Sequence, residues 1–227
     1  MALIAKTQHS DVLLITRVLS VVDWCLKHQF PDNYDARCMY SAFGASTMLN
    51  EAGLVAQIIT GDVYAFTVTP SGDQAIIQGF VGGTTEKPSH FWTECEGRIL
   101  DVGPSYLPKR SRIPVAPMPR IGWHKKASLP NYLTYDEQVR YAPDVGTAFT
   151  LEMEERMDGF LKLCKKRWAS KVAKHKPKSW LLTGVQSIER ASRAGDKWAK
   201  GALRYERMDG PRRPQPLPPG FVMLRSD

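Results

Sequence analysis

The sequence predicts an α+β fold in which a helix packs against an antiparallel sheet and further helices follow. Residues 35–53 place small and apolar side chains at three- and four-residue steps, which is a helical period, whereas residues 55–101 contain short alternating runs typical of strands. The helical period returns after residue 150. We therefore divide the chain into three parts: a core at 1–149, a basic helical segment at 150–210 packed on that core, and a Pro-rich tail at 211–227.

The first predicted helix follows Ser10, which can act as its N-cap. The run from Val12 to Leu26 is the most apolar part of the chain, but Arg17 and Asp23 interrupt it, so we do not expect it to span a membrane. Its apolar side chains recur on or near one face, as in an amphipathic helix. These side chains are Leu14, Val18, Val21, Val22 and Cys25.

The second predicted helix begins with Asp35 as N-cap and ends before Gly53, a residue typical of the position after a helix. Its buried stripe comprises Cys38, Ala42, Ala45, Leu49 and Ala52. Cys38 then lies in the first turn, where unpaired backbone N–H groups and the positive end of the helix dipole favour a thiolate. This placement suits a nucleophile.

Strands are predicted next, at Val55–Thr60 and Val63–Val68, with Gly61-Asp62 as the turn between them. A turn at 70–73 precedes a further short strand at Ala75–Phe80. The Gly-containing segment 81–89 reads as a loop leading directly to His90, either a mobile rim over a cleft or an ordinary surface loop.

The segment 89–104 predicts a β-hairpin with Glu96-Gly97 as a two-residue turn. Three pairs of opposed residues follow from this register: Cys95 with Arg98, Trp92 with Asp101, and His90 with Gly103. Because side chains alternate between the two faces of a strand, His90 and Asp101 should emerge on the same face as diagonal neighbours.

Cys38, His90 and Asp101 are the residue types of a nucleophilic cysteine site. Taken singly, each has an ordinary interpretation: a helical cysteine is usually a small apolar side chain, and a His or Asp near a turn is usually solvated. Their chain order and shared face together favour a catalytic site over these alternatives.

The chain resembles the papain-like superfamily, and within it the transglutaminase-like branch. The resemblance covers about 33–108 and is seen in the Cys at the start of a helix, the motif His90-Phe91-Trp92 on a strand, and an Asp on the next strand. It implies Cys38 as nucleophile, His90 as base and Asp101 as the orienting residue. Two departures are Met39, where an aromatic residue often follows the cysteine, and the lack of a Gln shortly before Cys38.

Without that Gln, stabilisation of the oxyanion must come from elsewhere. Asn33 is one candidate, although it can equally be a turn residue after Pro31, and the backbone N–H of Cys38 is another. The resemblance implies thiol-dependent acyl chemistry on an amide or ester substrate, with no metal or organic cofactor. Whether water or another acceptor completes the reaction, and so whether the enzyme is a hydrolase or an acyltransferase, is left open.

Downstream of the hairpin, Leu107–Pro130 is rich in proline and should be extended or irregular, with His124 as a surface loop residue. Thr150 can cap a helix that Pro177 ends. The apolar stripe expected of this helix comprises Leu151, Met153, Met157, Phe160, Leu161, Cys164 and Trp168. A second helical stretch is predicted from Ser179 to about Met208.

Basic charge is concentrated near the C-terminal end. The net charge is +8, yet the stretch from Arg156 to Arg213 alone contains 17 Lys or Arg and five Asp or Glu. This asymmetry favours an alternative function, a non-catalytic module that binds nucleic acid or an acidic partner, with Trp168, Trp180 and Trp198 available to stack on bases. Helical tryptophans more often pack into a core, so we expect weak contact with polyanions at most.

The four cysteines form no C-x-x-C pair, which argues against a zinc ribbon and a secreted disulfide framework. The simplest compartment is therefore a reducing one, and we expect a cytoplasmic protein. Residues 1–6 lack the basic start and long apolar core of a secretory signal.

Overall fold

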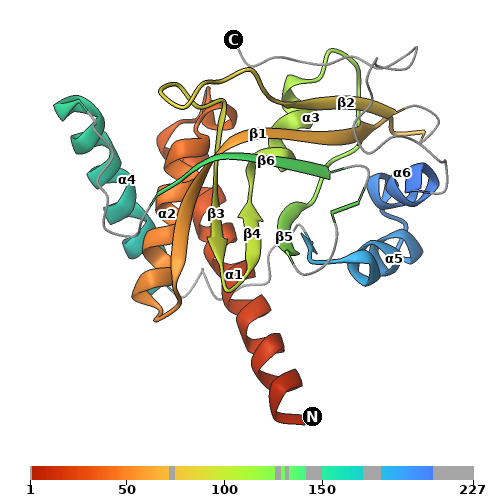
Figure 1. The fold of residues 1–227 in the computed structure, drawn as a ribbon, viewed down its shortest axis with the longest axis horizontal. Coiled ribbons are helices and arrows are strands. Elements are labelled where there is room, and N and C mark those ends of the chain that lie inside the picture. The colour runs from red at the N-terminus through yellow and green to blue at the C-terminus, as the bar shows by residue number, and fades with distance from the viewer. Residues whose placement is uncertain are drawn as a thin grey trace.

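The computed structural model is an α+β structure in which helices surround one seven-stranded, mostly antiparallel sheet (Figure 1). It describes residues 2–71, 75–125, 129–130, 133–141, 150–170 and 180–206. The strand order is β2-β1-β3-β4-β5-β7, and β6 pairs with β1. Every strand pair is antiparallel except β5–β7.

The helices are α1 (Ala2–Gln29), η1 (Tyr34–Ala36), α2 (Cys38–Glu51), η2 (Gly103–Tyr106), α3 (Leu107–Arg110), α4 (Leu151–Ala169), α5 (Val185–Arg193) and α6 (Lys197–Glu206). The strands are β1 (Ala56–Val68), β2 (Ala75–Phe80), β3 (His90–Cys95), β4 (Arg98–Asp101), β5 (Arg120–His124), β6 (Leu133–Arg140) and β7 (Leu181–Leu182).

The first of two cores joins α1, α2 and α4 to the sheet. Phe160 of α4 is fully buried and packs edge-on against Tyr40 of α2, with ring centres 5.7 Å apart. Gly44 permits this close approach, because a Cβ at that position would lie only 2.8 Å from the Phe160 ring. Thr93 of β3 donates a hydrogen bond to the Ala42 carbonyl at 3.0 Å. These contacts fix α2, and hence its first residue, relative to β3.

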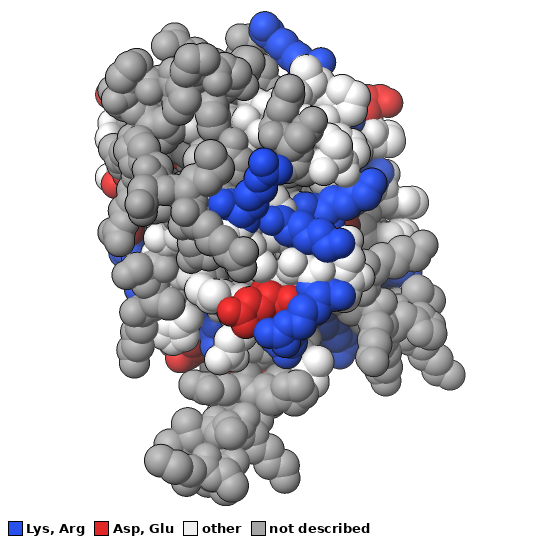
Figure 2. Space-filling view, turned by 90° about the vertical axis from the view of Figure 1, so that its right-hand side faces the viewer, with Lys and Arg blue, Asp and Glu red and all other residues white. Residues whose placement is uncertain are grey.

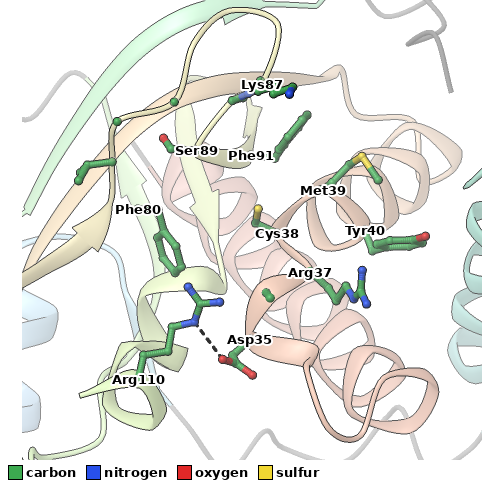
Figure 3. A pocket seen from close by; sticks show the side chains of 15 residues that line it. Asp35, Arg37, Cys38, Met39, Tyr40, Phe80, Lys87, Ser89, Phe91 and Arg110 are labelled. Atoms are coloured by element: carbon green, nitrogen blue, oxygen red, sulfur yellow. Dashed lines mark hydrogen bonds and ion pairs between the residues drawn. The ribbon is translucent and has the colours of Figure 1, made fainter. Parts of the chain in front are cut away.

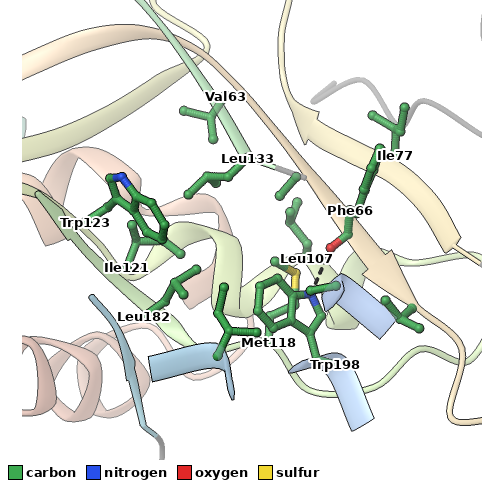
Figure 4. Packing of buried hydrophobic residues seen from close by; sticks show 14 of the residues in the cluster. Val63, Phe66, Ile77, Leu107, Met118, Ile121, Trp123, Leu133, Leu182 and Trp198 are labelled. Carbon is green, nitrogen blue, oxygen red and sulfur yellow. Dashed lines mark hydrogen bonds between the residues drawn. The ribbon is translucent and has the colours of Figure 1, made fainter. Parts of the chain in front are cut away.

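The second core lies between the sheet and the helices α5 and α6 (Figure 4). Trp123 of β5 and Trp198 of α6 are both 1% exposed. The indole Nε1 of Trp198 donates to the Phe66 carbonyl at 2.9 Å, so the tryptophan is satisfied by a backbone group of β1. The C-terminal helices are therefore built into the fold and pack on the sheet.

The two strands expected at 55–68 are one long strand, β1. Gly61 and Asp62 form no turn; they lie where the pairing of β1 with β6 shifts register, as at a β-bulge. A Cβ on Gly61 would come within 1.9 Å of the Asp136 carbonyl oxygen, which explains why a glycine occupies this point. Glycine is common both in turns and at β-bulges, so the local sequence does not distinguish these two structures at Gly61.

Helix α2 begins at Cys38, later than predicted, with Arg37 and not Asp35 as its N-cap. The Asp35 carboxylate instead binds Lys109 and Arg110 of α3. The end of the helix is as predicted, since Gly53 follows it with φ +83°. Helix α1 begins at Ala2, before the expected cap Ser10.

Thr150 caps α4 as predicted, accepting a hydrogen bond from the Met153 N–H at 3.3 Å. Of the predicted stripe, Met157, Phe160 and Cys164 are buried, whereas Leu151 and Met153 are exposed. The helix ends at Ala169, before Pro177, which lies outside the described residues, as does the tail 211–227.

Two other predictions for the second half of the chain were wrong. The stretch expected to be one helix from Ser179 contains the short strand β7 and the separate helices α5 and α6. The Pro-rich segment 107–130 is irregular at 111–119 and extended in β5, as predicted, but it begins with the helix α3, and His124 is the last residue of β5 and not a loop residue. No helix in the described ranges is long and apolar enough to cross a membrane.

Candidate active site

The predicted hairpin is present, with Cys95 paired to Arg98 and Thr93 paired to Leu100. Glu96 and Gly97 have φ values of +49° and +71°, the positive values that a two-residue type I′ turn requires. Continued by one residue, the β3–β4 register places Trp92 opposite Asp101. His90 and Asp101 consequently meet, and the His90 Nε2 donates to Asp101 Oδ2 at 2.7 Å.

The Asp101 carboxylate is 2% exposed and accepts hydrogen bonds from three donors. Its Oδ2 accepts from His90 and from the Tyr135 hydroxyl at 2.9 Å, and its Oδ1 accepts from the Gly103 N–H at 2.7 Å. Burial, together with the neighbouring Asp101 charge, raises the pKa of Tyr135 well above its usual value, so the phenol keeps its proton and remains a donor. This network fixes the carboxylate in one orientation.

His90 is fully buried and stacks on Phe80, with ring centres 4.4 Å apart and an interplanar angle of 12°. Gly103 leaves room for the imidazole, since a Cβ there would lie 2.4 Å from His90 Cε1. Burial alone would lower the pKa of His90, but the Asp101 carboxylate and Cys38 outweigh it and raise the pKa to about 10. The imidazole is therefore protonated at neutral pH.

Cys38 is half-buried at the first position of α2. Burial would raise the pKa of its thiol, but the adjacent His90 imidazolium and the Phe91 backbone N–H lower it below the usual value. Arg37 gives the helix no side-chain cap, so α2 also begins without a side-chain acceptor for its free N–H groups. Together these effects favour a thiolate facing an imidazolium.

The contact between Cys38 and His90 is looser than an ordinary hydrogen bond. Among the described residues, His90 Nδ1 has no hydrogen-bond partner of normal length, while Nε2 is occupied by Asp101. The two side chains are nevertheless close enough for each to shift the pKa of the other. Catalytic pairs are often loose without substrate and tighten when it binds.

The other three cysteines have different surroundings. Cys25, Cys95 and Cys164 are buried. Burial raises the pKa of Cys95 to about 12, and a hydrogen bond with Cys25 raises that of Cys164 further. The pKa of the Cys38 thiol is thus shifted in the opposite direction from those of Cys95 and Cys164.

A cavity of about 540 Å³ opens beside Cys38 (Figure 3). Its walls come from the start of α2, the end of β2, the segment 81–89 and Arg110 of α3. The lining is part apolar, with Met39, Phe80 and Phe91, and part charged. The charged lining residues are Asp35, Arg37, Lys87 and Arg110.

The segment 81–89, expected to be a loop, is anchored at several points. Ser89 Oγ lies 2.6 Å from Asp62 Oδ1 and 2.8 Å from the Gly61 carbonyl. The Thr84 N–H donates to the Lys87 carbonyl at 3.0 Å, which closes a turn within the segment. This wall of the cavity is thus tied to the bulge in β1.

Asn33 does not line the cavity. It is exposed, and its Oδ1 accepts a hydrogen bond from Arg37 Nε at 3.2 Å. The predicted oxyanion role of its side chain therefore finds no support in the contacts, and the start of α2 is the better source of donors. His124 pairs with Arg98 at the opposite end of the hairpin from His90.

Sequence reasoning missed Tyr135 and Arg110. Tyr135 comes from β6, whose pairing with β1 could not be read from local patterns. Arg110 lay in a segment that was interpreted as irregular. The predicted register placed Gly103 opposite His90. This pairing, with a residue that has no side chain, is the sequence feature that could have indicated the close approach to the imidazole.

No family model, curated protein or solved structure matches this chain. Its class is therefore defined by its own geometry: an α+β protein that brings a cysteine, a histidine and an aspartate together beside a cavity. Within the described ranges, no group of three or more His, Cys, Asp or Glu is placed to hold a metal ion.

Proposed function

We propose that this protein is a thiol-dependent acyl-transfer enzyme of papain-like or transglutaminase-like type, either a hydrolase or an acyltransferase that acts on an amide or ester. The observation that most supports the proposal is the opposed pKa shift of two neighbours, lowered for Cys38 and raised for His90. Such paired shifts beside a cavity are typical of catalytic groups. Isolated structural cysteines, such as Cys95, show the opposite shift.

The chemistry begins with attack of the Cys38 thiolate on the acyl carbonyl carbon. His90 already holds a proton, so it acts first as an acid and protonates the departing amine or alcohol. This order refines the expectation that His90 must first remove the thiol proton. The free backbone N–H groups at the start of α2, which has no side-chain cap, would supply donors to the oxyanion that forms.

The second half-reaction resolves the thioester. Neutral His90 removes a proton from the acceptor, which is water for a hydrolase and an amine or alcohol for an acyltransferase, and the acceptor oxygen or nitrogen attacks the thioester. Cys38 leaves as a thiolate and His90 is again an imidazolium. Asp101, held by Tyr135 and the Gly103 N–H, keeps the imidazole oriented throughout.

Alkylation with iodoacetamide tests the central claim. At pH 6.5 we expect Cys38 to react at least about tenfold faster than the other three cysteines, because its pKa is lowered and it lines a cavity, whereas the other three are buried. Mass-spectrometric mapping makes Cys25, Cys95 and Cys164 internal controls. Equal or faster labelling of any of these three would contradict the proposal.

Turnover of a reporter ester, p-nitrophenyl acetate, gives an independent test. Cys38→Ser should abolish the release of nitrophenol, because an alcohol is a far weaker nucleophile than a thiolate. Cys38→Ala should behave in the same way. Full retention of activity in both variants would exclude this site.

The alternative nucleic-acid function receives less support. Trp198 is buried, Trp180 donates to Asp196 Oδ2 at 2.9 Å, and the Arg17 guanidinium lies 3.7 Å over the ring centre of Trp168. All three tryptophans are therefore engaged in packing and are not free to stack on bases. Figure 2 does show Lys and Arg gathered on the face that bears α5 and α6, which leaves a weak contact with polyanions as a prediction.

A further inference from the structure

We propose that the cavity beside Cys38 contains a subsite for a carboxylate of the substrate, with Arg110 as the residue that binds it. The inference rests on the proposed function and specifies it: the substrate is an amide or ester that bears a carboxylate near the bond that reacts. Planar guanidinium groups bind carboxylates through two parallel hydrogen bonds, which a lysine cannot do.

Arg110 is held in place on both sides. Its Nε donates to Asp35 Oδ2 at 3.0 Å, and its guanidinium lies over the Phe80 ring, 5.6 Å from the ring centre. Figure 3 shows the guanidinium between Phe80 and Asp35, in the same cavity that Cys38 lines. Because the group is already oriented, little side-chain entropy remains to be lost when an anion binds.

The Nη atoms of Arg110 are open to a ligand. No residue in the described part of the chain hydrogen-bonds to either Nη, and the side chain retains 28% of its exposure. An arginine whose Nε alone is hydrogen-bonded within the protein still has the N–H groups of both Nη atoms available to bind a second carboxylate.

Asp35 does not neutralise this region by itself. Its Oδ1 also binds Lys109 Nζ at 2.7 Å, so two cations share one carboxylate. Burial would raise the pKa of Asp35, but the hydrogen bonds from Lys109 and Arg110 lower it, so the group stays charged and fully engaged. The cluster of Asp35, Lys109 and Arg110 retains one net positive charge.

The remaining charges of the lining also favour an anion. Asp35 is the single acidic residue among those lining the cavity, against Arg37, Lys87 and Arg110. Arg37 is less available, since its Nε donates to Asn33 and its guanidinium lies 5.0 Å from the Phe30 ring centre. Lys87, an exposed residue of the segment 81–89, has no carboxylate partner in the described residues and adds to the positive field.

A pair of charge-matched alkylating agents tests the subsite on the intact protein. Iodoacetylglycine carries a carboxylate, and iodoacetylglycinamide is the neutral reagent of the same shape. The measured quantity is the ratio of their rates at Cys38, read by mass spectrometry, so differences in intrinsic thiol reactivity cancel. In the wild type we expect the carboxylate reagent to react roughly fivefold faster, and raised salt to reduce this ratio.

Arg110→Gln should bring the ratio down to about one. Lys109→Gln is the matched control: it removes the same charge from the same carboxylate, but Lys109 does not line the cavity, so most of the preference should remain. Arg110→Lys should keep only part of it, because the bidentate geometry is lost. Thermal melts identify any variant that fails to fold, in which case the salt dependence of the wild-type ratio decides.

Failure of the subsite and failure of the enzyme proposal are distinguishable. A wild-type ratio of one or less, or an unchanged ratio in folded Arg110→Gln, would overturn the carboxylate subsite. The proposed function would still be supported in that case if the neutral reagent labels Cys38 rapidly. If the neutral reagent labels Cys38 no faster than the three buried cysteines, the proposed function itself fails.

Discussion

At the level of single residues, the candidate site is marked by opposed pKa shifts of two neighbours, raised for His90 and lowered for Cys38. Cys38, His90 and Asp101 were predictable because each is fixed by a local rule: a helix start for the thiol and the two-residue period of a hairpin for the other two. Tyr135 and Arg110 were not predictable, because their neighbours come from strands and turns brought close only by the folded chain. Local pattern does not report such long-range contacts.

The pKa values predict a bell-shaped dependence of activity on pH. The acidic limb should lie below the ordinary thiol pKa of about 8.5, where Cys38 becomes protonated, and the alkaline limb should lie near pH 10, where His90 loses its proton. Rates of hydrolysis of an anilide, whose amine needs a proton to leave, from pH 5 to 11 would measure both limbs. His90→Gln should move the thiolate titration seen by alkylation to higher pH; an unchanged titration would contradict the coupling.

Folding stability should respond to the same proton. His90 has a raised pKa in the folded state, so its protonation stabilises the fold fully below its ordinary pKa of about 6.5 and loses that effect as pH rises to about 10. In the wild type the decline should appear above about pH 8.5, because between about pH 6.5 and 8.5 the proton that Cys38 gives up on folding offsets the one that His90 gains, and denaturant unfolding at pH 7, 8.5 and 10 measures it. The decline should be smaller in His90→Gln, which has no such group.

Gly103→Ala should damage the site while leaving the hairpin formed. The added methyl group would lie 2.4 Å from His90 Cε1 and 3.0 Å from Asp101 Oδ1, so the imidazole must move. A shift of about 1 Å in a catalytic group can lower the rate about 100-fold. Esterase rates and far-UV circular dichroism measure the two effects, and Gly159→Ala, where the methyl group meets open space on α4, is the control. Equal activity of the two variants would argue against a tightly positioned His90.

At the level of helices and strands, most of the predicted elements exist, and their errors share one cause. Gly61-Asp62 looked like a turn and Asp35 looked like a cap, because those residue types are locally suited to both roles. In the structure Gly61 lies at a bulge against β6, and Asp35 forms ion pairs with α3. In both cases contacts with residues distant in sequence, and not the local residue type, determine the structure that forms.

The bulge in β1 should be essential to the site. Gly61 pairs with His90 across β1 and β3, and its carbonyl lies 2.8 Å from Ser89 Oγ, so it touches both the imidazole strand and the cavity wall. In Gly61→Ala the Cβ would collide with the Asp136 carbonyl, and we expect a loss of roughly 2 kcal/mol of stability or more. Urea unfolding tests this, with Gly53→Asn, a substitution suited to a positive φ at a helix end, as the tolerant control. A loss no larger than that of the control would show that the strand pair can relax around the methyl group.

For the molecule as a whole, the α+β class and the helical C-terminal half were evident from periodicity alone. We predicted that this part packs on the core, but the contacts that join the two were not evident, because Trp198 and Phe66, which join α6 to β1, are 132 residues apart. The asymmetry of charge was also plain in the sequence, and the structure places part of it on the face of α5 and α6 (Figure 2).

That face predicts a weak, salt-sensitive affinity for polyanions. In filter binding with heparin or duplex DNA we expect retention at about 20 mM salt and its loss by about 200 mM, because such binding depends on release of counterions. Replacing Arg190, Arg193 and Lys200 together with Gln should reduce the salt dependence, whereas Arg156→Gln, on α4, should not. Retention that persists at high salt would indicate a dedicated binding function and would contradict this prediction.

The two-residue turn between β3 and β4 sets a limit on how this protein can diverge. If one amino acid were inserted after Gly97 and the two-residue turn were kept, β4 would slip by one position against β3 and carry Asp101 to the opposite side of the sheet, away from the imidazole. The connection that precedes His90 has no such restriction, since its length does not alter which way the imidazole points. Homologues that keep the chemistry should therefore vary in length before the histidine, and should preserve an eleven-residue interval, as between His90 and Asp101, after it.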